Sequence, residues 1–203
     1  MNKKDFFCIT PFMYTEVFDK SQYLCCPSWL KENIYETDDI YSNFYSEKSN
    51  KIRQSILDGS YKYCDEVQCP YLASIKNGRP TGTSFKLKSA HPVPTPHISI
   101  LNMCFDRSCN LQCPTCRNEL INYLDNDRIK VDSKLKIIEE KFSATLQSLY
   151  LSGTADPFYS KSFRQFLINF EPSKYKVLRN IHLHTNGLLW TENLWNKMKK
   201  IHK

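Results

Sequence analysis

Apolar positions in the carboxyl-terminal half of the chain switch between strand-like and helix-like spacing. Short apolar runs at residues 98–104, 149–151 and 181–184 predict three strands. After each run, apolar side chains recur at helical spacing, at Leu135, Ile138 and Phe142, then Phe163, Phe166, Leu167 and Phe170, then Leu194, Trp195, Met198 and Ile201. Three successive βα units predict a parallel sheet or partial barrel, whose chemistry lies in the loops at the carboxyl ends of the strands.

The amino-terminal part is less regular. Aromatic-rich segments at residues 12–14 and 22–24 predict two short strands, and a helix is expected over residues 50–58. Gly59 suits a left-handed cap at the end of that helix. With so few aliphatic residues, a unit of about 76 residues would be marginal alone, which favours a bound metal that ties the chain together.

A proline-rich stretch separates the two parts. Residues 77–97 hold four of the ten prolines and two of the five glycines. Because proline fixes φ, this stretch is expected to be a stiff connector. The predicted organisation is a small irregular Cys-rich metal-binding domain at 1–76, a linker at 77–97, and an α/β domain of about three βα units at 98–203.

The chain has 203 residues and nine cysteines. No run of about 18 apolar residues exists, which excludes a membrane-spanning helix, and the first residues lack the apolar core of a secretory signal. We therefore expect a cytoplasmic protein. In that reducing compartment clustered cysteines serve as metal ligands or catalytic groups more often than as disulfides. An odd number also disfavours a pure disulfide framework.

The net charge of +7 is concentrated at the carboxyl end. Residues 174–203 hold seven Lys or Arg and one acid, for a charge of +6, which leaves +1 for residues 1–173. Such a run is typical of the solvated face of a last helix. The near-neutral body argues against a nucleic-acid-binding protein.

Three cysteines follow the first predicted strand of the second domain. Cys109, Cys113 and Cys116 have the spacing Cys-x3-Cys-x2-Cys, so one short loop holds three thiols. Such a loop can ligate three irons of a 4Fe-4S cluster and leave the fourth iron open to a small molecule. Structural zinc needs four ligands, and only Cys104 is nearby as a fourth.

In spacing and placement this loop resembles the signature of the radical S-adenosylmethionine (radical SAM) superfamily. The resemblance implies that Cys109, Cys113 and Cys116 ligate the cluster and that its open iron binds S-adenosylmethionine. In that family an electron from the cluster, supplied by a donor protein such as flavodoxin or ferredoxin, cleaves S-adenosylmethionine. The resulting 5'-deoxyadenosyl radical abstracts hydrogen from the substrate. Thr115 departs from the family, which usually has an aromatic residue there.

Loops after the other two strands add to the resemblance. Gly153, Thr154 and Asp156 lie where the family has a loop for the methionine amino group. Thr185 and Asn186 begin a Thr-Asn-Gly turn like the family's turn near the cofactor. The resemblance implies that these residues bind S-adenosylmethionine. Taken alone, both segments also fit ordinary turns, with Asp156 as a helix cap.

The amino-terminal cysteines resemble a SPASM segment, the auxiliary 4Fe-4S module of many radical SAM enzymes. The resemblance implies a second cluster and leaves the choice between the two adjacent cysteines open. Four thiolates also make a good zinc site, so zinc remains the alternative. The implied ligands are Cys8, Cys25, Cys26, Cys64 and Cys69.

The resemblance covers nearly the whole chain, although a radical SAM core usually has six βα units and only three fit here. The chain is then a fragment, a protein whose barrel a partner completes, or a degenerate member with an unpaired sheet edge. His182 and His184 alternate with apolar residues and either face a substrate or serve the structure. The predicted function is radical chemistry on an unknown substrate, with a slight preference for a peptide. The alternative is a non-catalytic zinc or iron-sulfur module that acts through protein partners.

Overall fold

The computed structural model describes residues 3–77, 85–151 and 154–201, and the chain forms two compact units. The first unit comprises Met1–Glu16 and Ser21–Ile98, and the second comprises Val17–Lys20 and Ser99–Lys203. The predicted linker differs from the structure. Its residues 78–84 lie outside the described part, but β4 (Phe85–Leu87) pairs antiparallel with β1 (Phe6–Cys8) in the first unit. Residues 85–87 therefore form a strand of the first unit. The prolines on either side of them had led to the prediction of a connector without regular structure.

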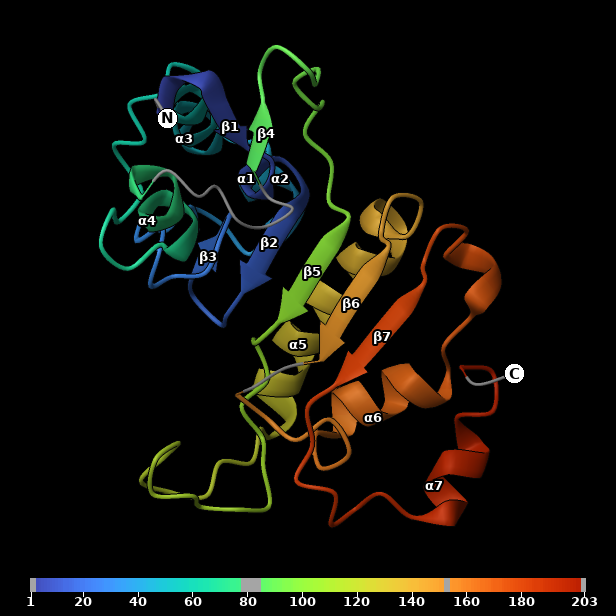
Figure 1. Ribbon diagram of the computed structural model, residues 1–203. Coiled ribbons are helices and arrows are strands. Elements are labelled where there is room, and N and C mark those ends of the chain that lie inside the picture. Colours follow the sequence, from blue (N-terminus) through green and yellow to red (C-terminus); the bar gives the residue numbers. More distant parts are fainter. Residues whose placement is uncertain (1–2, 78–84, 152–153, 202–203) are drawn as a thin grey trace. The chain divides into compact units, whose positions relative to one another are not determined.

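The first unit is built from short elements (Figure 1). One predicted strand is wrong in part, because Phe12 and Met13 lie in a helical turn that begins beside Pro11. Proline is well suited to the first turn of a helix. The elements are η1 (Lys3–Asp5), β1, α1 (Thr10–Met13), β2 (Tyr14–Val17), β3 (Gln22–Tyr23), α2 (Ile40–Phe44), α3 (Glu47–Leu57), α4 (Pro70–Lys76) and β4.

Helix α3 confirms the predicted helix and its glycine stop. The Ser46 side chain accepts a bond from Ser49 N (3.2 Å) and caps the start of the helix. Gly59 follows its end with a φ of +78°, which is the left-handed conformation. A Cβ at this position would lie 2.9 Å from Lys4 Cγ, so the close approach of the chain also requires glycine.

A buried arginine holds the first unit together. Arg53 on α3 is 3% exposed, and its Nε donates to Pro11 O (2.9 Å). Its other nitrogens donate to Phe44 O (2.8 Å) and to Asn50 Oδ1 (3.0 Å). The guanidinium thereby binds backbone carbonyls of two other segments of the unit.

The second unit is a mixed α/β fold with a parallel sheet, as the hydrophobic spacing predicts. Strands β5, β6 and β7 lie in that order, and both pairings are parallel. Helix α5 begins at Asp125, ten residues before Leu135, which is the first apolar position of the predicted spacing. The polar first turns of the helix carry no apolar spacing that could have predicted this start. The elements are β5 (Ile100–Met103), α5 (Asp125–Ile137), η2 (Ile138–Phe142), β6 (Ser148–Leu151), α6 (Lys161–Ile168), η3 (Pro172–Lys174), β7 (Asn180–Leu183) and α7 (Glu192–Lys197).

Alternation along the strands divides the sheet into two different faces. Leu101, Met103, Leu149 and Leu151 are buried and form the core of this unit. On the other face the half-buried rings of Tyr150 and His182 stack at 4.1 Å with an angle of 4°. The paired rings favour the structural interpretation of His182.

The parallel strands form an open sheet, and in the described part of the chain they do not close into a barrel. The same described ranges contain no helix with the length and apolar character needed to cross a bilayer.

Candidate functional site

A cavity of about 300 Å³ lies at the carboxyl ends of the three parallel strands. Each of the three following loops contributes to it, and the ends of β5, β6 and β7 can be followed in Figure 1. Residues far apart in sequence thus meet at one edge of the sheet. The lining comprises Cys109, Leu111, Cys113, Cys116, Arg117, Ala155, Asp156, His184, Thr185 and Asn186.

The cysteine loop presents its thiols to this cavity. Cys109 N donates to Ile121 O (2.9 Å), which closes the base of the loop. Cys116 N donates to Cys113 O (2.9 Å), so a tight turn separates the last two cysteines. Cys109 is half-buried, Cys113 and Cys116 are exposed, and all three are free thiols. The predicted ligands therefore line a single open cavity.

Asp156 joins two of the loops through its carboxylate. The side chain is 1% exposed, and Oδ2 accepts bonds from Thr185 Oγ1 (2.7 Å) and Asn186 N (2.9 Å). Its Oδ1 accepts bonds from the amides of Phe158 (3.0 Å) and Tyr159 (3.1 Å). With two donors on each oxygen, this carboxylate holds the loops after β6 and β7 together, and its contact with S-adenosylmethionine stays a prediction.

Of the other residues predicted to bind the cofactor, one side chain faces the thiols of the cavity and another ties two loops together. Asn186 Nδ2 lies 3.8 Å from Cys109 Sγ and donates to Asn110 Oδ1 (2.9 Å). Thr154 Oγ1 donates to Cys104 O (3.0 Å), which ties two loops together. Gly153 lies outside the described residues. Asn186 is thus the predicted contact whose side chain reaches a thiol.

Arg117 is a residue of this site that the sequence reasoning missed. Its side chain is 8% exposed, and its two terminal nitrogens donate to Arg107 O (2.7 Å) and Thr154 O (2.6 Å). One of them also lies 3.7 Å from Cys116 Sγ. The guanidinium therefore ties the cysteine loop to the loop after β6 and places a positive charge beside a thiol. In the sequence, only its position directly after Cys116 indicated that it belongs to the site.

Four cysteines from separate segments lie near one another inside the first unit. Burial raises the pKa of Cys8 to about 11 and that of Cys64 to about 12. The pKa of Cys25 is also raised, first by burial and then by the neighbouring thiols of Cys8, Cys69 and Cys64. Cys8, Cys64 and Cys69 pack in one apolar cluster. These four residues, Cys8, Cys25, Cys64 and Cys69, are called the buried thiol set below.

Cys26 does not share that environment. It is half-buried, and its thiol is not among the groups that raise the pKa of Cys8, Cys25 or Cys64, although its backbone hydrogen bond lowers the pKa of Cys25. Its carbonyl instead accepts bonds from Trp29 N (2.9 Å) and Leu30 N (3.0 Å), which turn the chain. The geometry thus separates the two adjacent cysteines, which the sequence leaves open.

Asp65 shapes the segment between Cys64 and Cys69. Its Oδ1 accepts bonds from Val67 N and Gln68 N, both at 2.9 Å, and Lys31 lies 2.7 Å from Oδ2. The Lys31 side chain and these backbone amides lower the pKa of Asp65 to about 2. This Asx turn joins Cys64 and Cys69, which both pack in the apolar cluster. The spacing of the two cysteines in the sequence did not indicate the turn.

The two thiol sets have the same donor chemistry and differ in how open they are to solvent. Across residues 3–77, 85–151 and 154–201, no three His, Cys, Asp or Glu side chains are grouped closely enough to form a metal site. In donor chemistry both sets fit, because thiolates are the ligands that zinc and iron-sulfur clusters select. The loop set offers three donors on one open cavity, and the buried thiol set offers four, of which Cys8, Cys64 and Cys69 pack in one apolar cluster.

Comparison of the chain with protein-family models, with curated proteins and with solved structures found no match in any of the three.

Proposed function

We propose that the chain is a radical SAM enzyme, or a part of one, in which Cys109, Cys113 and Cys116 hold a 4Fe-4S cluster. The observation that carries the proposal is their position on the loop after the first parallel strand, in a cavity that the next two loops also line. When bound, the cluster supplies the electron that cleaves S-adenosylmethionine and starts radical chemistry on a substrate.

The residues around the loop support an open ligand site. Three thiolates carry a charge of −3, and the Arg117 guanidinium beside Cys116 offsets part of it. Asn186 Nδ2 lies close enough to Cys109 Sγ to donate to a thiolate, and hydrogen bonds to sulfur tune a cluster's potential. In this proposal the carboxylate of Asp156, which its four donors hold at the cavity, contacts the ammonium group of S-adenosylmethionine.

In the same proposal the buried thiol set holds an auxiliary iron-sulfur cluster, with zinc as the alternative. Its support is the convergence of thiols from β1, the loop after β3 and both ends of the segment before α4. A partial barrel, a cytoplasmic location, an electron donor such as flavodoxin or ferredoxin, and a substrate with a slight preference for a peptide complete the proposal.

The decisive experiment is low-temperature EPR on anaerobically reconstituted, dithionite-reduced protein, with and without S-adenosylmethionine. Wild type is expected to give a reduced-cluster signal that S-adenosylmethionine changes. Cys113→Ala should lose this response, and Cys26→Ala, the matched control, should keep it.

A Cys64→Ala variant separates the two sites in the same experiment. Loss of one signal with the S-adenosylmethionine response retained would assign the remaining signal to the loop. A wild-type signal indifferent to S-adenosylmethionine, or a colourless protein that retains only zinc, would instead favour the non-catalytic metal-binding module.

A further inference from the structure

The turn after β7 carries two exposed apolar side chains next to the cysteine cavity. Leu188 is 64% exposed and Trp190 is 49% exposed. Gly187, with a φ of +79°, and a bond from Trp190 N to Gly187 O (3.1 Å) keep the turn tight. Neighbouring large apolar side chains that remain exposed mark binding surfaces more often than scattered ones do.

One side chain connects this turn with the cysteine loop. Asn186 Nδ2 lies 3.8 Å from Cys109 Sγ, and Asn186 Oδ1 accepts a bond from Leu188 N (3.0 Å). A single residue therefore separates the thiol from the exposed turn. An electron that enters the protein at this turn would have a short path to a cluster on the loop.

Aromatic neighbours hold Trp190 in place. Its ring centroid lies 5.7 Å from that of Phe158 and 5.7 Å from that of Trp195. Phe158 is fully buried, and its amide donates to Asp156 Oδ1 (3.0 Å). The indole thus packs on a fixed part of the site while about half of its surface stays accessible. A tryptophan held in this way is typical of the centre of a protein interface.

Bases from α6 lie close to this ring. Arg164 Nη1 donates to Phe158 O (3.1 Å), so the guanidinium contacts the residue on which Trp190 packs. Lys161 is exposed, and it shares a face of α6 with Arg164, three positions later. Within residues 3–77, 85–151 and 154–201, neither base forms an ion pair.

The charge at this end of the second unit is positive. Helix α7 and the turn that follows it add the exposed side chains of Lys197 and Lys199, against one exposed acid, Glu192. With Lys161 and Arg164 the balance is four bases against one acid, a charge of +3. Complementary charge raises the rate at which an acidic protein finds such a surface.

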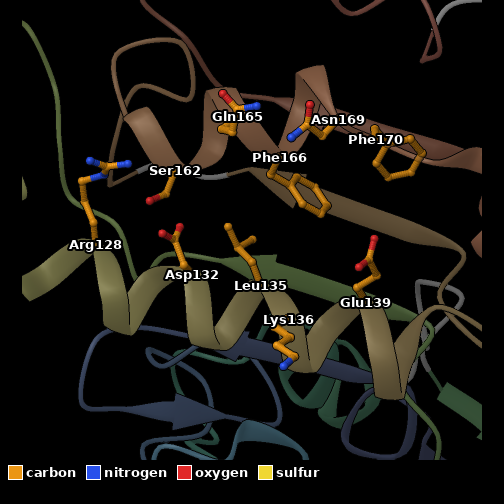
Figure 2. A pocket seen from close by; sticks show the side chains of 10 residues that line it. All are labelled: Arg128, Asp132, Leu135, Lys136, Glu139, Ser162, Gln165, Phe166, Asn169 and Phe170. Atoms are coloured by element: carbon orange, nitrogen blue, oxygen red, sulfur yellow. The ribbon is translucent and has the colours of Figure 1, made fainter. Parts of the chain in front are cut away.

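The groove between α5 and α6 provides the contrast. The charged side chains of its lining, shown in Figure 2, are Arg128, Asp132, Lys136 and Glu139. Two bases and two acids leave this groove without a net charge. Lys161 and Arg164 do not line it. The excess of bases therefore belongs to a different face of α6, the one that carries these two residues.

We infer that Leu188, Trp190, Lys161 and Arg164 form the docking site of the acidic protein that supplies electrons to the cysteine loop. These four residues are called the Trp190 surface below. The inference rests on the proposed function, because a donor is needed only if the loop holds a cluster. Electron-transfer partners bury small surfaces. A central tryptophan beside bases suits such a contact, since the apolar centre gives affinity and the charges give speed and orientation.

The test compares two reductants of the anaerobically reconstituted full chain. Photoreduced flavodoxin of acidic composition has to dock, whereas dithionite is small and does not. Rapid freezing and EPR follow the cluster signal that responds to S-adenosylmethionine, so that only the loop cluster is counted. The rate with flavodoxin should fall at least about tenfold between about 0.05 and 0.5 M salt, because salt screens the charges of the Trp190 surface.

Two variants probe the surface directly. Lys161→Glu/Leu188→Glu places two acids on it and should lower the flavodoxin rate about tenfold or more at low salt. Trp190→Ala should lower it about tenfold. Both should keep the dithionite rate within about threefold, because a small reductant needs no docking surface. Circular dichroism checks that each variant is folded.

The matched control is Lys176→Glu/Val177→Glu. It also replaces an exposed base and an exposed aliphatic residue, but before β7, at the opposite end of the strand from the cysteine cavity. Both rates should stay within about threefold of wild type, since these residues lie outside the Trp190 surface.

The outcomes separate this inference from the proposed function. A wild-type protein that dithionite does not reduce would end the proposed function, and the donor's role with it. A cluster that dithionite reduces, with equal flavodoxin rates in wild type and both surface variants, would overturn the docking site alone. An equal loss in the control would do the same. A dimer in sedimentation that Lys161→Glu/Leu188→Glu abolishes would instead assign the surface to a second copy of the chain.

Discussion

The two units of the chain use the same side chain in opposite surroundings. The buried thiol set contains residues that are up to 61 positions apart, from Cys8 to Cys69, and all of them except Cys25 pack in one apolar cluster. The loop thiols come from eight consecutive residues, and Cys113 and Cys116 are exposed. Burial raises the pKa of Cys8, Cys25 and Cys64 in the first set, whereas the second set is open to solvent and to a ligand. The contrast teaches that a set of four buried thiols suits a structural metal, whose ligands all come from the protein. A set of three exposed thiols suits a reactive metal centre, which keeps one position open to a ligand.

Each unit also contains an arginine that binds two backbone carbonyls, and these two arginines have different roles. Arg53 closes the packing of α3 on its neighbours, far from solvent. Arg117 joins two loops and touches a thiol. We expect the first to determine stability and the second to determine how the loop holds its ligand.

The largest expected effect is that of metal removal from the buried thiol set. A structural thiolate site contributes on the order of 10 kcal/mol to folding, so chelation under anaerobic conditions should strongly lower the unfolding temperature. The Cys113→Ala/Cys116→Ala double variant should show the same loss, since its first unit is intact. Circular dichroism melts measure this, and an unfolding temperature insensitive to chelation would contradict a structural metal in the first unit.

The second largest expected effect is a difference in alkylation rate between the buried thiol set and the loop thiols, measured on metal-free protein at pH 8. A pKa of about 12, against an ordinary value of 9.0, lowers the thiolate fraction of Cys64 about 1,000-fold. Cys113 and Cys116 should therefore react with iodoacetamide first, as mass spectrometry of digested protein would show. Equal rates for Cys64 and Cys113 would break the comparison.

The pH dependence of stability in metal-free protein follows from the same burial. Cys8 is protonated in both states at neutral pH, but above about pH 9 the unfolded state loses its proton first. The free energy of unfolding should consequently fall as the pH rises from about 9 to about 11. Cys8→Ala should show a smaller fall than wild type when urea titrations are repeated across this range.

Replacement of Arg53, the buried arginine of the first unit, should lower the free energy of unfolding by less than metal removal does. Arg53→Met leaves three acceptors without their donor, at about 1 kcal/mol or more each, so we expect a loss of about 3 kcal/mol in the free energy of unfolding. Lys51→Met removes only an exposed pair with Glu47 and should change it by less than about 0.5 kcal/mol. Urea titration measures both, and similar losses would refute the assigned role of Arg53.

The smallest effect on stability is expected at the cysteine loop. Lys cannot span two carbonyls as the Arg117 fork does, so Arg117→Lys should lower iron retention about 10-fold to 100-fold. Global stability should fall by only about 1 kcal/mol. The control is Arg107→Lys at an exposed side chain. Iron analysis after gel filtration gives the result, and equal retention in all three proteins would remove Arg117 from the site.

Much of the fold could be predicted because its hydrophobic spacing is local. The pattern at Leu149, Leu151, Phe163 and Leu167 is set by which face is buried, and the structure confirms both elements. The start of α5 and the pairing of β4 could not be predicted. Polar turns carry no periodic signal, and the pairing of Phe85 with Cys8 depends on residues far apart in the chain.

The candidate site shows the same division. The sequence by itself determined the spacing of Cys109, Cys113 and Cys116, the order of the βα units and therefore the edge of the sheet where their loops lie. Only the tertiary structure decided that Cys25 joins the buried thiol set, that Asp156 is occupied by its neighbours and that Arg117 bridges two loops. The physical reason is that spacing is a property of one segment, whereas burial, hydrogen bonding and charge depend on which segments meet.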